Sequence, residues 1–352
     1  MSSLTRGERV ALVLIAALSA LAGVANYGTW APVPRFALAT LALAGLAWVV
    51  SFATEQLGER FGPGVTGMLQ STLGNLPELF VVVFALKAGE LIVAQTAIVG
   101  SILANALLVL GLVIVIGARR SADGTMRFSK RLPRDTATLL LLTVFIIVLL
   151  GLSLAAHDPA SHHVKAISAI GAVCLLVVYL AWVIPYLRSD EPPPDDGRGP
   201  RLGLRVTLTL LAIAGTGSAF VSDWFVAALA PAITVLNISQ AFAGLVIVAI
   251  AGNAVENAAG LALAYKRRFD LAISVVKNSV AQIAAFLFPL LVLISFALST
   301  QLTFALAPVY IGALALTALA VWQVTGDGEA AAFEGWALVA VYVILATITL
   351  YE

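Results

Sequence analysis

Two glutamates within long apolar stretches are the residues of this chain best suited to chemistry. Glu78 ends the segment GNLPE (74–78) and Glu256 ends GNAVE (252–256), so each follows a Gly-Asn pair at the same spacing. An ionised carboxylate is costly inside a membrane, and an acid in such a position is a functional candidate. Two of them in matching motifs predict one site.

The two motifs belong to an internal repeat. Residues 66–115 align without a gap on residues 244–293, at an offset of 178 residues. Both copies carry a serine 27 residues after the motif glycine. Side chains three or four residues apart share a helical face, which groups further polar residues with the glutamates and serines. The predicted ligand set is therefore Glu78, Glu256, Asn75, Asn253, Ser101, Asn105, Ser279 and Gln282.

Carboxylate, amide and hydroxyl oxygens without sulfur or imidazole suit a hard cation such as Ca²⁺. Burial and a neighbouring carboxylate both favour the neutral, protonated form of a carboxyl group, so Glu78 and Glu256 should also hold protons. Cation and protons would then compete for one site. The sequence contains no GxxxxGK[ST] motif. These features predict an exchange of cation for protons that uses ion gradients and needs no cofactor.

The composition indicates what positions these residues. The chain has 352 residues, is 61% hydrophobic and only 11% charged, and has a mean hydropathy of +1.02. An ordinary soluble enzyme carries about 25% charged residues, and a net charge of +1 argues against nucleic-acid binding. We predict an all-α membrane protein in a lipid bilayer with eleven transmembrane helices, at about 10–26, 35–54, 65–86, 91–117, 134–156, 164–187, 204–228, 238–265, 269–297, 303–323 and 335–351.

The helix count makes the repeat an inverted one. Glu78 falls on the third helix and Glu256 on the eighth, and an odd number of helices between equivalent positions reverses the direction of the second copy. Inverted repeats of this kind are common in secondary transporters. The predicted organisation is an N-terminal helix, two repeats of five helices, and a cytoplasmic acidic, proline-rich linker between them; the ranges are 1–30, 31–188, 189–203 and 204–352. The first segment also fits a cleaved signal peptide.

Basic residues predict the orientation. Sixteen lie on the side of the N-terminus, whereas only Arg35, Lys87 and Lys165 lie on the opposite side. Because basic loops stay in the cytoplasm, the N-terminus is expected inside and the C-terminus outside the cell's inner (plasma) membrane.

The segments 74–111 and 239–289, which hold both GNxxE motifs, resemble the calcium/proton antiporter family of the cation/Ca²⁺ exchanger superfamily. The resemblance covers both repeats and implies that the chain is not an enzyme. It also implies that Glu78 and Glu256 hold the cation and the protons. Acids on the helix before each motif helix are a further feature of the family, which points to Glu55 and Asp223. Gln95 is another polar residue on the helix that follows the first motif.

Two departures from the family leave the transported cation open. Asn257 stands where the family commonly has histidine, and Lys277 precedes Asn278, where the family usually has glycine. Lys277 could reach the cytoplasmic interface, or it could place a positive charge near the site and disfavour Ca²⁺ relative to Na⁺ or K⁺.

Export of Ca²⁺ in exchange for H⁺ is the leading hypothesis, and a Na⁺ or K⁺/H⁺ antiporter of the same fold is the first alternative. An intramembrane enzyme and a passive channel are weaker alternatives. Nothing in the sequence supports a particular oligomer.

Overall fold

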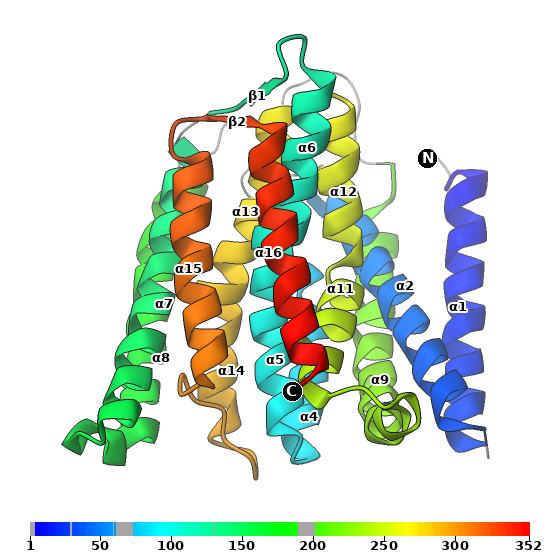
Figure 1. Cartoon of the computed structure of the whole chain (residues 1–352). Helices are drawn as coiled ribbons and strands as arrows, with labels where there is room; N and C mark the ends of the chain where they lie inside the picture. The colour runs from blue at the N-terminus through cyan, green and yellow to red at the C-terminus, as the bar shows by residue number, and fades with distance from the viewer. Residues whose placement is uncertain (1–3, 29, 59, 61–72, 130, 189–200) are drawn as a thin grey trace.

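The computed structural model describes residues 4–28, 30–58, 60, 73–129, 131–188 and 201–352. Within these ranges the chain is almost entirely helical, as predicted (Figure 1). Among the described residues, nine helices are long and apolar enough to cross a membrane, and a tenth is added if one bent pair counts as a single span. The predicted third span (65–86) and the linker (189–203) lie partly outside the described residues.

The elements of the described residues follow in chain order. The first half contains α1 (Arg6–Tyr27), α2 (Pro32–Gly58), α4 (Leu76–Lys87), α5 (Leu91–Leu103), the π-helical segment η1 (Ala104–Val109), α6 (Leu110–Arg120), β1 (Thr125–Arg127), α7 (Arg131–Ala156), the short 3₁₀ helix η2 (Pro159–His163) and α8 (Val164–Arg188). The second half contains α9 (Leu204–Leu236), α10 (Gln240–Phe242), the π-helical segments η3 (Ala243–Val248) and η4 (Ile283–Leu287), α11 (Ala249–Gly252), α12 (Ala254–Tyr265), α13 (Phe269–Gln282), α14 (Phe288–Ser295), α15 (Pro308–Thr325), β2 (Glu329–Ala331) and α16 (Ala332–Leu350).

Two of the predicted segment bounds differ clearly from the structure. The helix predicted at 204–228 continues to Leu236, because Pro231 is accommodated inside α9. The segment predicted to start at 303 begins its helix only at Pro308, whose missing N–H suits the first turn.

Corresponding elements of the two halves fall at the repeat offset seen in the sequence. Helices α4 and α12 have the same length and start 178 residues apart, and α5 and α13 start at the same separation. Both α5 and α13 then pass into a π-helical segment, η1 or η4. In Figure 1, α5 continues upward into α6, whereas α13 continues downward into α14.

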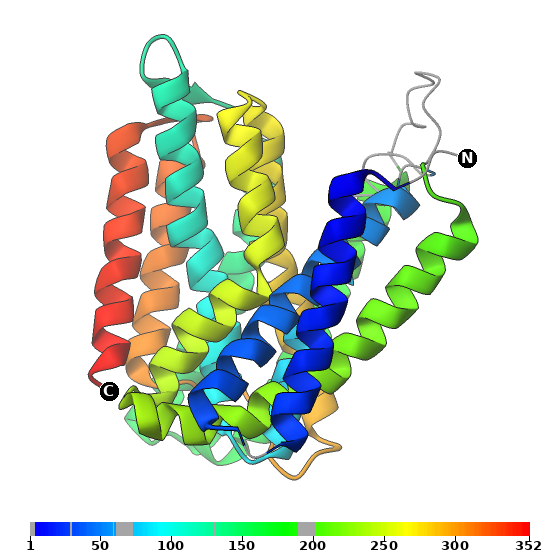
Figure 2. The same ribbon diagram turned by 90° about the vertical axis from the view of Figure 1, so that its right-hand side faces the viewer.

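Glycines allow helices of the two halves to cross closely at the centre. Gly100 of α5 meets the backbone of Leu245 in η3, and Gly244 of η3 meets the side chain of Thr96, with no room at either glycine for a Cβ atom. On one side of this core, α1, α2 and α9 form a slanted group (Figure 2). The core thus fixes the helix after the first motif against the segment before the second motif.

A small sheet joins two loops at one end of the bundle. Strand β1 pairs antiparallel with β2, with Thr125 opposite Ala331 and Arg127 opposite Glu329 (Figure 1). This sheet lies above α15 and beside the upper end of α6, and it links the loop before α7 to the loop before α16.

The contact between α6 and α16 yields a stability prediction. A Cβ atom at Gly111 would lie 2.6 Å from the carbonyl oxygen of Gly335. We expect Gly111→Ala to destabilise the protein by about 1–3 kcal/mol because neither backbone can easily retreat. Gly312→Ala is the control, since a Cβ atom there meets nothing within 4 Å, and a helical alanine should stabilise it slightly. Thermal unfolding in detergent measures both variants, and equal shifts would contradict this packing argument.

Candidate cation site

Both motif glutamates lie just after a break in the helical backbone. The break falls at Asn75 (φ −81°, ψ 3°) and at Asn253 (φ −98°, ψ 11°), which directly precede α4 and α12. Glu78 and Glu256 are therefore in the first turn of their helices, and not in a helix interior as the apolar surroundings suggested. At the second break the axes of the flanking helices differ by 61°.

Glu78 is held by hydrogen bonds from both halves of the chain. Its side chain is 5% exposed. The hydroxyl of Ser101 donates to Glu78 Oε1, and Asn253 Nδ2 donates to the same oxygen at 2.5 Å. Asn253 Nδ2 also lies 3.0 Å from Ser101 Oγ and 2.9 Å from the carbonyl oxygen of Ala249. The amide of Asn253 thus positions the carboxylate of the other motif.

A chain of polar contacts continues from Asn253 to the second glutamate. Asn105 Nδ2 donates to Asn253 Oδ1 at 3.1 Å and to Ser279 Oγ at 3.0 Å. Ser279 Oγ in turn lies 3.5 Å from Glu256 Oε2, a long contact. Six of the eight predicted ligand residues therefore form one connected cluster, which contains both carboxylates.

Each motif glutamate packs against the motif glycine of the other half. A Cβ atom at Gly252 would lie 2.8 Å from Glu78 Cγ, and one at Gly74 would lie 2.5 Å from Glu256 Oε1. The absence of a side chain at these glycines makes room for the opposite carboxylate, which the sequence analysis did not predict. The repeat offset is the one sequence signal for this pairing, because it matches the glycine and glutamate of one motif to those of the other.

The two halves of the cluster are not equivalent. Asn105 bridges the halves, but the residue 178 positions later is Ile283, which has no polar side chain. Within the described residues, the buried atoms Asn75 Oδ1 and Glu78 Oε2 have no hydrogen-bond partner. These acceptors are available to a cation, whose preferred protein ligands are oxygens of this kind.

The remaining predicted residues are divided between the core and the surface. Gln282 is 2% exposed and lies one turn after Ser279 on α13. Gln95 Nε2 donates instead to the carbonyl oxygen of Ala305 at 3.1 Å. Glu55 on α2 and Asp223 on α9 are exposed.

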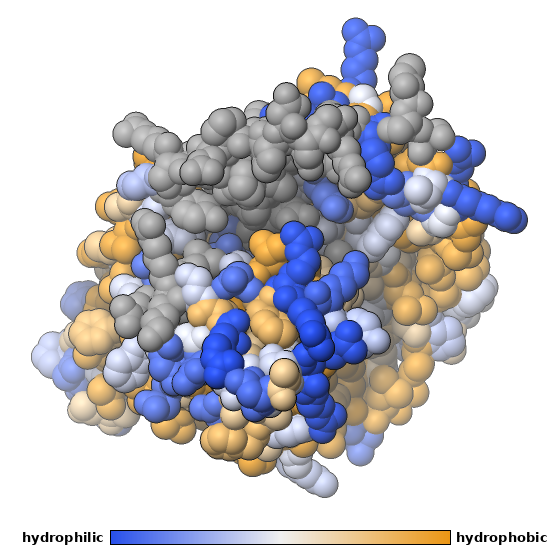
Figure 3. Space-filling model, turned by 90° about the horizontal axis from the view of Figure 1, so that it is seen from above, coloured by the Kyte–Doolittle hydropathy of each residue, from blue (hydrophilic) through white to orange (hydrophobic). Residues whose placement is uncertain are grey.

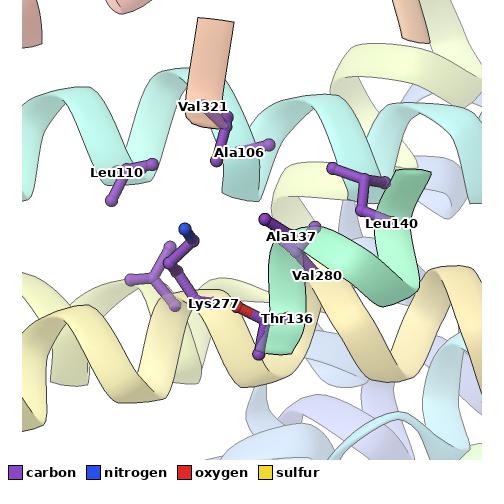
Figure 4. A pocket seen from close by; sticks show the side chains of 9 residues that line it. Ala106, Leu110, Thr136, Ala137, Leu140, Lys277, Val280 and Val321 are labelled. Atoms are coloured by element: carbon purple, nitrogen blue, oxygen red, sulfur yellow. The ribbon is translucent and has the colours of Figure 1, made fainter. Parts of the chain in front are cut away.

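Lys277 is buried within the protein, at 3% exposed. Its Nζ donates to Thr325 Oγ1 at 2.7 Å, at the last residue of α15. Figure 4 shows its side chain beside a small cavity, of about 10 Å³, between helices that include α7, α13 and α15. Its partner Thr325 could not be found from the sequence, because it lies outside the repeated segments.

The donor set determines which ion could fit. The described residues contain no group of three or more His, Cys, Asp or Glu side chains arranged to hold a metal. A cation between Glu78 and Glu256 would instead complete its shell with amide and hydroxyl oxygens. Such mixed oxygen ligands fit Ca²⁺ and alkali cations and disfavour softer metals.

Comparison with known proteins finds relatives that cover almost the whole chain. The vacuolar calcium ion transporter of Schizosaccharomyces pombe is 32% identical over 335 residues, covering 92% of this chain and 80% of the relative. The Ca²⁺/H⁺ antiporter of Synechocystis is 30% identical and covers 96% of both chains. The Ca²⁺/H⁺ antiporter ChaA of Bacillus subtilis is 27% identical, covering 96% of this chain and 98% of the relative.

Solved structures have the same fold. Native YfkE aligns with a TM-score of 0.80 at 27% identity, covering 97% of this chain and 100% of that one. The H⁺/Ca²⁺ exchanger CAX aligns with a TM-score of 0.76 over 98% of this chain and 93% of that one, at 17% identity, which shows the fold alone. The predicted resemblance to calcium/proton antiporters is confirmed by these relatives. The family described as sodium/calcium exchanger protein matches residues 32–185 and 206–351, so the chain belongs to the sodium/calcium exchanger family.

Proposed function

We propose that this protein exports Ca²⁺ across the plasma membrane in exchange for H⁺. The observation that carries the proposal is the single polar cluster that links Glu78 to Glu256 through Ser101, Asn253, Asn105 and Ser279. Relatives named as Ca²⁺/H⁺ antiporters support the choice of ion and of counter-ion.

The cluster supports competition between cation and protons. Burial of two carboxylates that share a cluster favours their protonated forms, whereas a divalent cation favours the ionised forms. Loading Ca²⁺ therefore releases protons, and protonation releases Ca²⁺. Glu78 and Glu256 are the proton-coupling residues, and the other six predicted ligands supply neutral oxygens.

The arrangement of the two halves supports alternating access. We infer that residues 31–188 and 204–352 form inverted repeats with the site between them, after an N-terminal helix (1–30). The motif helices support this, because α4 lies in the lower half of the bundle and α12 in the upper half (Figure 1). An ion bound where α4 and α12 meet could be reached from either side of the membrane if the backbone changed conformation at Asn75 or at Asn253.

The charge distribution supports the direction of transport. Exposed basic residues are concentrated at the upper end of Figure 1, which is seen face-on in Figure 3. Basic loops remain in the cytoplasm, so this end, with the N-terminus, would be inside and the C-terminus outside. Cytoplasmic Ca²⁺ would then leave the cell as protons enter down their gradient.

A Na⁺ or K⁺/H⁺ antiporter is the second candidate, and buried Lys277 favours it. Lys277 lies on α13, two residues before Ser279, and its amine donates to Thr325 Oγ1 of α15. A positive charge there would oppose a divalent cation more than a monovalent one.

Inside-out membrane vesicles with an imposed pH gradient separate the two candidates. We expect added Ca²⁺ to dissipate the gradient, and increasing external acidity to raise the Ca²⁺ concentration needed for half-maximal effect, because protons compete. Dissipation by Na⁺ or K⁺ but not by Ca²⁺ would contradict the calcium proposal and support the second candidate. A current that rises with voltage without proton movement would indicate a channel.

A further inference from the structure

Five exposed cations are gathered at the upper end of α6 and at the turn between α12 and α13. They are Arg119, Arg120, Lys266, Arg267 and Arg268. Among the described residues, none of the five has a carboxylate within salt-bridge distance. Arg127 and Arg201, by contrast, pair with Asp123, Glu329 or Glu8. The cluster is therefore an uncompensated positive surface, which we call the α6 basic corner.

Aromatic rings hold the two arginines of the α6 basic corner. The guanidinium of Arg120 lies 4.4 Å from the ring centroid of Tyr265, and that of Arg119 lies 5.7 Å from that of Trp336. Stacking on a ring orients a guanidinium but leaves the N–H groups at its edge available. No hydrogen bond from either guanidinium to a described residue uses these donors.

The position of these rings indicates the depth of the corner in a bilayer. Tyr265 is 60% exposed and Trp336 46% exposed, and both lie at helix ends next to apolar, outward-facing surface such as Phe333. Tyr and Trp with this exposure are typical of the membrane–water interface. Helix α6 packs against both α12 and α16 (Figure 1), so Tyr265 of α12 and Trp336 of α16 contact the two arginines from neighbouring helices.

Among the described residues, the acid next to the turn between α12 and α13 is Asp270, while Asp123 after α6 already pairs with Arg127. Asp270 follows Arg268 by two residues, and its Oδ1 accepts from the backbone N–H of Ser129 at 2.6 Å. It leaves a clear positive excess at the level of lipid headgroups.

We propose that the α6 basic corner binds the headgroup of an anionic phospholipid, with the phosphate on Arg119, Arg120 and Lys266 and the acyl chains along α12 and α16. Charge complementarity, the interfacial rings and the adjoining apolar surface select a lipid. The proposal depends on the chain spanning a bilayer and not on which cation it exchanges.

The test compares phosphatidylglycerol with phosphatidylcholine, added to purified protein in detergent, by native mass spectrometry and thermal unfolding. We expect phosphatidylglycerol to bind and to raise the unfolding temperature, and phosphatidylcholine to do neither. The triple variant Arg119→Gln, Arg120→Gln, Lys266→Gln should bind phosphatidylglycerol about a hundredfold more weakly, since each cation contributes roughly fivefold.

A second triple variant controls for loss of charge alone. Arg6→Gln, Arg9→Gln and Arg205→Gln remove three exposed cations from α1 and α9 at the same end of the bundle, and should leave binding unchanged. The single variant Lys266→Gln, the mildest change, should still weaken binding about fivefold. The proposal is wrong if both triple variants bind phosphatidylglycerol as the wild type does, or if the two lipids act alike. Equal stabilisation by inorganic phosphate would also overturn it, because the site would then recognise a free anion.

Discussion

Replacing Glu78 or Glu256 by glutamine will abolish cation-driven proton movement. Glutamine keeps the shape and the hydrogen-bonding reach of the side chain but removes both the negative charge and the exchangeable proton. At about 4 Å, and with a protein-like screening, one unit charge contributes several kcal/mol to the binding of a cation. The loss should therefore be on the order of 100-fold or more in each variant. Proton release from inside-out vesicles after addition of Ca²⁺ measures it.

A matched acid elsewhere separates this effect from a general loss of charge. Glu329 lies in β2, is exposed, and pairs with Arg127 at 3.5 Å, far along the chain from both motifs. Glu329→Gln should transport at nearly the wild-type rate. Coupled transport that persists in both Glu78→Gln and Glu256→Gln would remove the proposed mechanism, whatever the control does.

The repeat in the sequence is what made the site predictable. A fixed offset places Glu78 with Glu256 and Ser101 with Ser279, and helical spacing adds Asn75 and Asn253. The structure brings most of this set into contact because both breaks fall at the motif asparagines. The all-helical class follows equally directly, since long apolar runs have no other way to satisfy their backbone in lipid.

Contacts between helices distant in the sequence could not be predicted in the same way. Nothing local indicates that Gly100 meets the backbone of Leu245, or that Lys277 lies against Thr325 at the end of α15. Helix ends were also uncertain, because an apolar run such as 204–236 continues smoothly through Pro231. The position of the Lys277 amine could not be predicted for the same reason, since Thr325 and the α7 residues beside it lie outside the two aligned segments 66–115 and 244–293.

The inequality of the two half-sites has a consequence for transport. Asn253 contacts Glu78, Ser101, Asn105 and the backbone of Ala249. Its counterpart Asn75 is also buried, at 4% exposed, but its Oδ1 has no partner among the described residues. The first carboxylate is thus positioned by the amide of the second half, whereas the hydrogen bond found for the second carboxylate among the described residues is the long contact with Ser279. Substitutions at the two asparagines should therefore not be equivalent.

Asn253→Leu should reduce Ca²⁺-driven proton movement by roughly 10- to 100-fold, and by more than Asn75→Leu. Leucine has a similar volume, but it leaves buried polar groups of Glu78, Ser101 and Asn105 without their partner, at about 1–3 kcal/mol for each buried group left unsatisfied. Rates measured across Ca²⁺ concentrations, together with the unfolding temperature, distinguish a disordered site from an unfolded protein. Equal losses in the two variants would mean that the half-sites act alike. The hydrogen bond from Asn253 to Glu78 would then contribute no more to exchange than the unpartnered Oδ1 of Asn75.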